Sequence, residues 1–257
     1  MKGGIFGLSG KTALITGGSR GIGLAIAEGL AENGADAVIV ARDQKQLQAA
    51  KQQIQSHSGK KVWTFSFDLK NVEQIGELFE NIISKVKDID LLVNCAGTTN
   101  RIPAEDVEIE NWKQVMELNL TAVFVMSQAF CRHRKQIGKG GRIINIGSLL
   151  CHGARPTIAP YAASKGGLLM LTKSLAVEWA KYNINVNAIG PGYISTDLTA
   201  PLRADGDFNR WVLSRTPLER WGQPEDLVGT AVFLASSASN FVTGQIIYVD
   251  GGWVAAL

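Results

Sequence analysis

The stretch TALITGGSRGIG, residues 12–23, decides the fold. It joins a short apolar run to a glycine-rich turn, and a helical pattern follows the turn. A turn of this kind lets the backbone approach a pyrophosphate, whose negative charge is favoured at the N-terminus of the helix. The spacing is G-x-x-x-G-x-G, which is neither G-x-G-x-x-G nor a Walker A loop. The context predicts a dinucleotide-binding turn, and a tight turn that binds nothing is the alternative.

Short apolar runs recur along the chain and alternate with longer helical patterns. Most of the runs are apolar throughout, as in strands that are covered on both faces. Residues 72–86 show the clearest helical spacing, with Asn71 as the expected N-cap. The pattern predicts an α/β fold over residues 1–257: one doubly wound Rossmann domain with a parallel, seven-stranded sheet flanked by helices. The predicted strands are 12–15, 37–40, 62–65, 91–93, 142–146, 184–189 and 245–249.

The composition excludes several classes of protein. The 257 residues carry 26 Lys and Arg against 23 Asp and Glu, and a net charge of +3 is too small to indicate a nucleic-acid partner. No apolar run reaches the ~18 residues of a membrane span, and the start lacks the pattern of a signal peptide. An odd, scattered set of cysteines predicts reduced thiols and a cytoplasmic protein. They are Cys95, Cys131 and Cys151.

Further motifs follow the first turn in a fixed order. Asn94-Cys95-Ala96-Gly97 ends the fourth predicted strand, and Pro191-Gly192 follows the sixth. Tyr161 and Lys165 form a Tyr-x-x-x-Lys motif, with Ser148 thirteen residues before the tyrosine. Together with the glycine turn, this set resembles the short-chain dehydrogenase/reductase family. Cys95 departs from the family pattern, which has a second asparagine at that position.

The resemblance implies a catalytic set of Asn119, Ser148, Tyr161 and Lys165. Tyr161 and Lys165 are one helical turn apart and therefore share a face. A cation within ~4–6 Å lowers the pKa of a phenol from its usual value near ~10, so Tyr161 is expected to act as general acid or base. Ser148 would hold the substrate oxygen, and the resemblance places Asn119 at a helix kink that extends the proton relay.

Other chemistries find no support in the sequence. Ser148 lies outside any G-x-S-x-G motif, so a serine hydrolase is not expected. The histidines at 57, 133 and 152 lack metal-ligand spacing and the cysteines form no C-x-x-C, so no metal site is predicted.

The cofactor is expected to be NADP, with NAD left open. The position where this family carries an acidic residue for the ribose of NAD falls on Ala41, and Arg42 beside it suits a 2′-phosphate. Asp43 is the complication, because a small shift of the turn would bring it to the ribose. The resemblance implies the remaining cofactor contacts, at Gly17, Ser19, Arg20, Gly21, Ile22, Gly23, Asp68, Leu69, Asn94, Ala96, Gly97, Tyr161, Lys165, Pro191, Gly192, Ile194 and Thr196.

The substrate is less well defined by the sequence. Residues 195–223 form a long connection, as substrate lids often do. Basic side chains after the predicted strands suit a carboxylate. Stretches at 157–161, 208–211, 215–217, 220–224 and 249–253 resemble gluconate 5-dehydrogenases and related sugar-acid dehydrogenases, although other branches share the last three. The candidate substrate residues are Arg101, Ser148, His152, Arg155 and Tyr193.

The sequence thus predicts an NADP-preferring oxidoreductase that transfers a hydride between nicotinamide and a secondary alcohol or ketone, with a polyol or sugar acid such as gluconate or ketogluconate as substrate. A 3-oxoacyl-thioester (carrier-protein) reductase, or another ketone reductase, is the alternative of the same class. A non-catalytic NADP-binding scaffold is the alternative of another class. The resemblance implies a homotetramer, and the apolar run 251–257 is expected to be exposed and to mark an interface.

Overall fold

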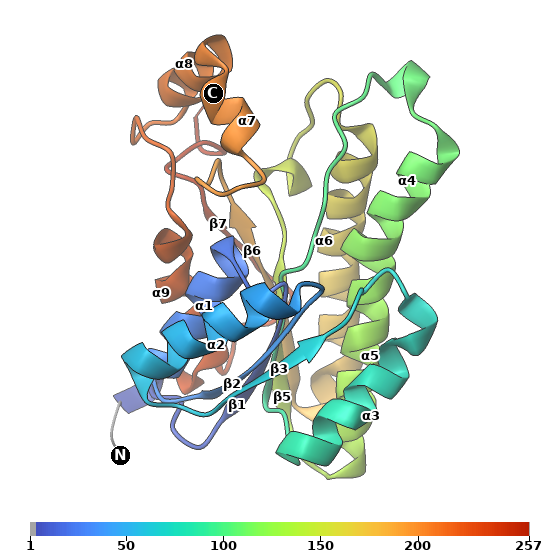
Figure 1. Ribbon diagram of the computed structural model, residues 1–257, viewed down its shortest axis with the longest axis vertical. Helices are drawn as coiled ribbons and strands as arrows, with labels where there is room; N and C mark the ends of the chain where they lie inside the picture. Colours follow the sequence, from blue (N-terminus) through green and yellow to red (C-terminus); the bar gives the residue numbers. More distant parts are fainter. Residues whose placement is uncertain (1–3, 257) are drawn as a thin grey trace.

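The computed structural model describes residues 4–256 and confirms the predicted α/β class. Seven parallel strands form one sheet in the order β3-β2-β1-β4-β5-β6-β7 (Figure 1). The order reverses between β1 and β4, where such sheets open a crevice at the carboxyl ends of the strands. The strands are β1 (Thr12–Thr16), β2 (Asp36–Ala41), β3 (Val62–Ser66), β4 (Leu91–Asn94), β5 (Gly141–Ile146), β6 (Ile184–Pro191) and β7 (Ile246–Val249).

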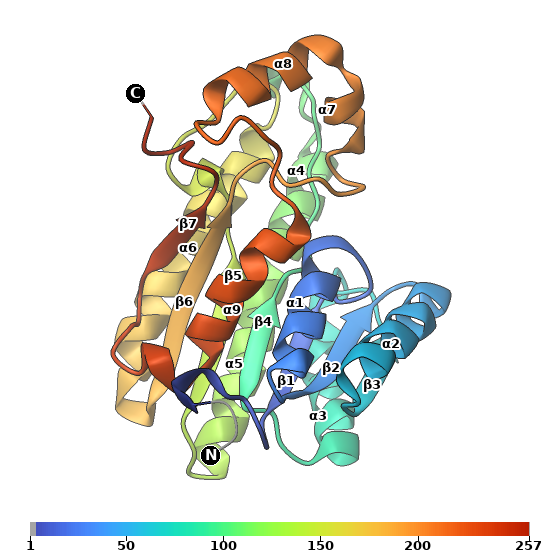
Figure 2. The same cartoon turned by 90° about the vertical axis from the view of Figure 1, so that its left-hand side faces the viewer.

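Helices cover both faces of the sheet. On one face lie α1 (Gly21–Glu32), α2 (Gln44–Ser58) and α9 (Val228–Ala235); on the other lie α3 (Ile75–Val86), α5 (Ala122–Gln136) and α6 (Ala159–Trp179), with α4 (Ile109–Met116) preceding α5 (Figures 1 and 2). Each face has its own apolar core. Within β1, Leu14 packs into one core and its neighbour Ile15 into the other, which explains why the strand is apolar throughout.

Two helical stretches are irregular, and the first departs from the sequence expectation. Residues 72–74 form a short 3₁₀ turn, α3 begins only at Ile75, and the Asn71 side chain makes no capping hydrogen bond. The helical stretch around Asn119 is divided, because a π-helical turn, η4 (Glu117–Thr121), separates α4 from α5 at the place where the resemblance implies a helix kink. Such turns are rare and are often found at functional sites. Among the described residues, no helix is long and apolar enough to cross a bilayer.

The connection after β6 carries two short helices beyond the carboxyl ends of the strands. These are α7 (Ala200–Ala204) and α8 (Gly206–Arg215), which lie above β6 and β7 in Figure 2. An isolated parallel bridge between Ile194 and Gly222 ties the two ends of the connection together. The connection therefore leaves the sheet and returns to it at neighbouring positions. We call residues 195–223 the lid segment.

Candidate active site

The glycine-rich turn packs tightly between β1 and α1. Gly17 has φ +68°, and a Cβ there would lie 3.0 Å from the Ala96 backbone. A Cβ on Gly23 would lie 2.2 Å from the Gly17 carbonyl oxygen, so neither glycine tolerates a side chain. The N-cap of α1 is Arg20, whose side chain makes no capping hydrogen bond. The first N–H groups of α1 therefore lack a side-chain cap, as a pyrophosphate site at a helix N-terminus requires.

The end of β4 is fixed by side chains of β1 and β5. Thr16 Oγ1 accepts hydrogen bonds from the backbone N–H groups of Cys95 (3.0 Å) and Ala96 (3.3 Å). The buried Asn94 amide donates to Asn145 Oδ1 (2.9 Å) and to Ser127 Oγ (3.0 Å). Asn94 therefore uses its side chain inside the protein, which leaves its backbone for any cofactor contact.

Cys95, the residue that departs from the family pattern, is not expected to be reactive. Burial raises the pKa of Cys95 to about 12, although the charge of Lys165 opposes the rise. The thiol therefore stays neutral, and a thiolate nucleophile is disfavoured here. All three cysteines are free.

The turn after β2 resolves the ambiguity between Arg42 and Asp43. Asp43 Oδ1 caps α2, accepting from the backbone N–H groups of Lys45 (2.8 Å) and Gln46 (3.0 Å). The carboxylate is thus committed to the helix N-terminus. Arg42 is exposed immediately beyond β2, with its carbonyl accepting from Ser66 Oγ (2.8 Å). With Arg42 exposed and Asp43 occupied, the turn favours NADP, which carries a 2′-phosphate, over NAD, whose ribose 2′-hydroxyl would need an acidic residue.

The remaining predicted cofactor residues border the crevice at the ends of β3 and β6. Asp68 turns its carboxylate onto the backbone N–H of Lys70 (3.1 Å), and Leu69 is buried. At Gly192, a Cβ would lie 2.7 Å from the Asp250 Cα. Thr196 lies 3.5 Å from the Cβ position of Gly21, which brings the start of the lid segment against the glycine turn.

Ser148 and Tyr161 form the centre of the site. Ser148 follows β5 and is buried, and its Oγ accepts from the backbone N–H of Leu150 (3.1 Å). Burial raises the pKa of Tyr161 to about 12; a hydrogen bond with Ser148 and the charge of Arg101 oppose that rise. The structure thus places the predicted tyrosine beside the predicted serine.

Lys165 lies on the same face of α6, as the spacing predicts. Its ammonium is buried, donates to the carbonyl of Ile146 (2.7 Å) and lies 5.6 Å from the centre of the Tyr161 ring. Burial lowers the pKa of Lys165. A cation at this distance favours the phenolate form of the tyrosine.

Asn119 is fully buried in the π-helical turn η4. Its Oδ1 accepts from the backbone N–H of Thr98 (2.9 Å), and its Nδ2 donates to the Thr98 carbonyl (2.9 Å). The same Nδ2 donates to Ser164 Oγ (3.1 Å). The amide therefore joins the loop after β4 to α6. The sequence analysis did not single out Ser164 or Thr98.

Two arginines from different loops lie near one another at the site, and Arg101 also lies near Tyr161. The pKa of Arg101 is lowered by partial burial and by the charge of Arg155, and raised by Tyr161 and Tyr193. Arg101 Nη2 donates to the Leu198 carbonyl of the lid segment (3.2 Å). Three of the candidate substrate residues therefore lie near Tyr161: Ser148, Tyr193 and Arg101. Arg155 adds a second positive charge close to Arg101.

Aromatic side chains from the stretches 208–211 and 249–253 surround Tyr193, an arrangement that the sequence does not predict. Its ring contacts Phe208 and Trp211 of α8 at centroid distances of 5.7 and 6.1 Å, and Trp253 at 4.9 Å. Trp253 also contacts Trp211 at 5.0 Å. The expectation of an exposed tail over 251–257 is thus wrong for Trp253, because this ring packs against the lid segment; Leu257 lies outside the described residues.

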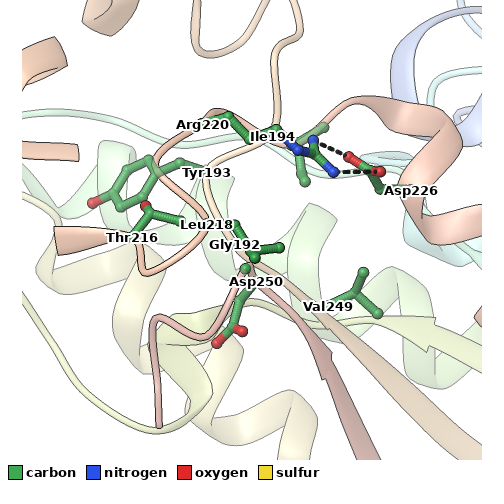
Figure 3. A pocket seen from close by; sticks show the side chains of 11 residues that line it. Gly192, Tyr193, Ile194, Thr216, Leu218, Arg220, Asp226, Val249 and Asp250 are labelled. Carbon is green, nitrogen blue, oxygen red and sulfur yellow. Dashed lines mark hydrogen bonds and ion pairs between the residues drawn. The ribbon is translucent and has the colours of Figure 1, made fainter. Parts of the chain in front are cut away.

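His152 makes no ring contact with this cluster. It is exposed, and its ring meets Tyr248 edge to face at a centroid distance of 6.5 Å. Next to Tyr193, a cavity of about 210 Å³ opens between the ends of β6 and β7 and the turn at 216–222 (Figure 3). Neither Ser148 nor Tyr161 lines it, so the cavity adjoins the catalytic residues without containing them.

His57 has neighbours that its spacing in the sequence does not reveal. It forms an ion pair with Glu28 of α1, and potential metal ligands of His57, Glu28 and Glu32 lie within 4.8 Å of one another. These side chains belong to α1 and α2, and none of them belongs to the catalytic set.

The fold and this geometry define a nicotinamide-dependent oxidoreductase. A family model described as enoyl-(acyl carrier protein) reductase matches residues 17–254. The chain belongs to the short-chain dehydrogenase/reductase family, as the order of its motifs predicts.

Relatives within the family sharpen this placement. A gluconate 5-dehydrogenase from Gluconobacter oxydans is 43% identical over 253 residues, covering 98% of both chains. A 2-dehydro-3-deoxy-D-gluconate 5-dehydrogenase from Bacillus subtilis is 46% identical over 253 residues, covering 97% of this chain and 96% of the relative. The crystal structure of a gluconate 5-dehydrogenase from Burkholderia cenocepacia, in complex with NADP and tartrate, matches with a TM-score of 0.94 and 43% identity over 98% of both chains.

Proposed function

We propose that the protein is an NADP-dependent oxidoreductase that interconverts a hydroxyl group and a ketone on a sugar acid of the gluconate type. The observation that carries this proposal is the pair of arginines at this site: Arg101 lies beside Tyr161, and Arg155 lies beside Arg101. Two guanidinium groups at the rim of a proton-transfer site suit a substrate with a carboxylate away from the reacting carbon. The sugar-acid relatives support the same substrate class.

The chemistry divides between the cofactor and this chain. NADP, when bound, supplies the hydride chemistry. Ser148 and Tyr161 hold the reacting oxygen between them, and the Tyr161 hydroxyl gives the proton to it during reduction or takes it during oxidation. Lys165 favours the phenolate by its charge, and the hydrogen bond to Ile146 fixes its ammonium.

The cofactor preference rests on the turn after β2. Arg42 is free to meet a 2′-phosphate while Asp43 caps α2. Arg20 of the glycine turn forms an exposed ion pair with Asp197 of the lid segment at 3.0 Å. Arg20 and Arg42 thus follow the neighbouring parallel strands β1 and β2 at their carboxyl ends, the edge at which such sheets bind ligands. Structural neighbours crystallised with NADP agree with this preference.

We further propose that the lid segment covers the substrate. It meets the glycine turn through Arg20 and Asp197, and the loop after β4 through Arg101 and Leu198. Both contacts lie across the crevice at the carboxyl ends of the strands. A segment held from two sides in this way encloses a bound substrate and excludes water from it.

We propose a homotetramer, on the evidence of an apolar helical surface. Met170 and Val177 of α6 are 62% and 82% exposed, and Phe124 of α5 is 39% exposed. Large apolar side chains on the outer faces of two neighbouring helices are typical of subunit contacts. The three free cysteines favour a reducing compartment, and we propose the cytoplasm.

A substrate panel tests the activity. Purified protein is assayed by nicotinamide absorbance with gluconate, 5-ketogluconate, a 2-dehydro-3-deoxygluconate, a neutral polyol and an acetoacetyl thioester, each with both cofactors. We expect the sugar acids to give the highest kcat/KM, with NADP preferred. A preference for the thioester would replace the proposal by a carrier-protein reductase. Binding of NADPH without turnover of any substrate would indicate a scaffold.

A further inference from the structure

Ser164 occupies a buried position between the two catalytic residues of α6. It is 0% exposed, and it precedes Lys165 directly. Its hydroxyl donates to the backbone carbonyl of Tyr161 (2.7 Å) and accepts from Nδ2 of Asn119 (3.1 Å). One hydroxyl therefore joins the π-helical turn η4 to the turn of α6 that carries the proton donor.

Helix propensity does not explain why residue 164 is a serine. Alanine is the better helix former, and a serine hydroxyl that bonds back to a preceding carbonyl slightly destabilises and bends a helix. The Ser164 hydroxyl does so and simultaneously receives the amide of Asn119. The backbone N–H and carbonyl of Thr98 both hold the Asn119 side chain. The amide that donates to the Ser164 hydroxyl is therefore already fixed in place.

We propose that Ser164 is a positioning residue for proton transfer, because its hydroxyl couples Asn119 to the backbone of Tyr161 and thereby fixes the phenol against Ser148. The inference rests on the proposed role of Tyr161 as proton donor and is independent of which substrate is turned over. Loss of the coupling allows the first turn of α6 to relax. The contact between Tyr161 and Ser148 then weakens, and proton transfer slows.

The same helix contains a matched control. Thr172, two turns further along α6, is also fully buried. Its Oγ1 donates to the Leu168 carbonyl (2.8 Å) and accepts from Nδ2 of Asn145 (2.9 Å). The junction is built in the same way, but it lies away from the catalytic turn. Thr172→Val removes its hydroxyl at nearly constant volume. The variant therefore measures how much stability the protein loses when a buried hydroxyl with two such hydrogen bonds is removed.

The pH profile separates positioning from a general loss of stability. The other groups that act on Tyr161 are the charges of Cys151, Tyr193 and Arg101, together with the Lys165 ammonium 5.6 Å from the ring. Ser164→Ala leaves all of them in the chain. A weaker hydrogen bond from Ser148 raises the pKa of Tyr161, so the rising limb of alcohol oxidation moves to higher pH.

The experiment uses the best substrate that the wild-type protein turns over. For Ser164→Ala we expect kcat to fall about three- to tenfold, the worth of one buried hydrogen bond, with the cofactor Kd unchanged. The rising limb should move by roughly half a pH unit to one unit. Thr172→Val should lower the Tm by a comparable amount and leave kcat and the pH limb at wild-type values. Equal effects of both variants on kcat would overturn the proposal.

A double-mutant cycle with Asn119→Ala tests the coupling itself. If Ser164 acts through Asn119, adding Ser164→Ala to Asn119→Ala costs no further activity. Fully additive losses would show that the two side chains act independently and would refute the inference. A failure of the sugar-acid assignment leaves this test intact, because the cycle compares variants on any substrate with measurable wild-type turnover.

Discussion

Replacing Arg101 by alanine removes one of the two neighbouring positive charges of the site, the one that lies beside Tyr161. In the structure this guanidinium reaches the Leu198 carbonyl (3.2 Å), and the nearby charge of Arg155 lowers its pKa further. If the substrate is a sugar acid, its carboxylate is the natural partner of this pair. We therefore expect Arg101→Ala to weaken the binding of acidic substrates and to spare the binding of NADP.

The magnitude follows from two contributions. A charge-assisted hydrogen bond is worth roughly 1.5–3 kcal/mol, which corresponds to about a ten- to hundredfold change in kcat/KM. Arg155 remains to hold part of the carboxylate, so the expected loss is near the lower limit, about tenfold. Arg101 also lowers the pKa of Tyr161, and losing that charge slows acidic and neutral substrates alike.

The assay compares an acidic and a neutral substrate in the same variant. The ratio of their kcat/KM values cancels the shared effect on Tyr161 and isolates the carboxylate contact. Arg210→Ala is the control, because this arginine pairs with Asp207 on the exposed side of α8. We expect the ratio to fall about tenfold in Arg101→Ala and to stay constant in Arg210→Ala. Equal losses on both substrates would refute the carboxylate contact.

Four further predictions follow from the structure. Tyr161→Phe should lower turnover by on the order of 10²-fold with NADPH binding retained, and near-normal rates would exclude it as the proton donor. Lys165→Met should move the rising limb of oxidation to higher pH, because the phenolate loses a cation 5.6 Å away; an unmoved limb contradicts that role. Ala41→Asp with Arg42→Leu should shift the ratio of kcat/KM values from NADP toward NAD, unless the wild type already prefers NAD. Val177→Glu should dissociate the tetramer in light scattering, and an unchanged mass would place the interface elsewhere.

Much of the fold and of the catalytic set is predictable from the sequence, because both depend on local patterns. Apolar runs mark the parallel strands, which are buried on both faces. The spacing of Tyr161 and Lys165 places both on one face of α6, and the structure confirms this. The glycine turn is predictable for the same reason, since Gly17 and Gly23 leave no room for a Cβ.

The details that sequence reasoning missed depend on contacts between distant segments. No pattern indicates that Trp253 packs on Tyr193, because the two lie on segments that meet only in three dimensions. The ion pair between His57 and Glu28 likewise joins separate helices. Asn71 failed as a cap because the chain first forms a 3₁₀ turn, a choice that local propensity does not determine.

The residues that can be predicted from the sequence and those that cannot have different tasks in the proposed site. The proton-transfer groups stand on rigid elements, since Ser148 follows β5 and Tyr161 lies in the first turn of α6. The groups expected to select the substrate come from loops: Arg101 after β4, Arg155 after β5 and the aromatic side chains of the lid segment. A rigid element constrains residue type and spacing, whereas a loop constrains neither strongly. Substitutions in the lid segment are therefore expected to change the substrate while Ser148 and Tyr161 keep their geometry, because function depends on the site and not on the fold alone.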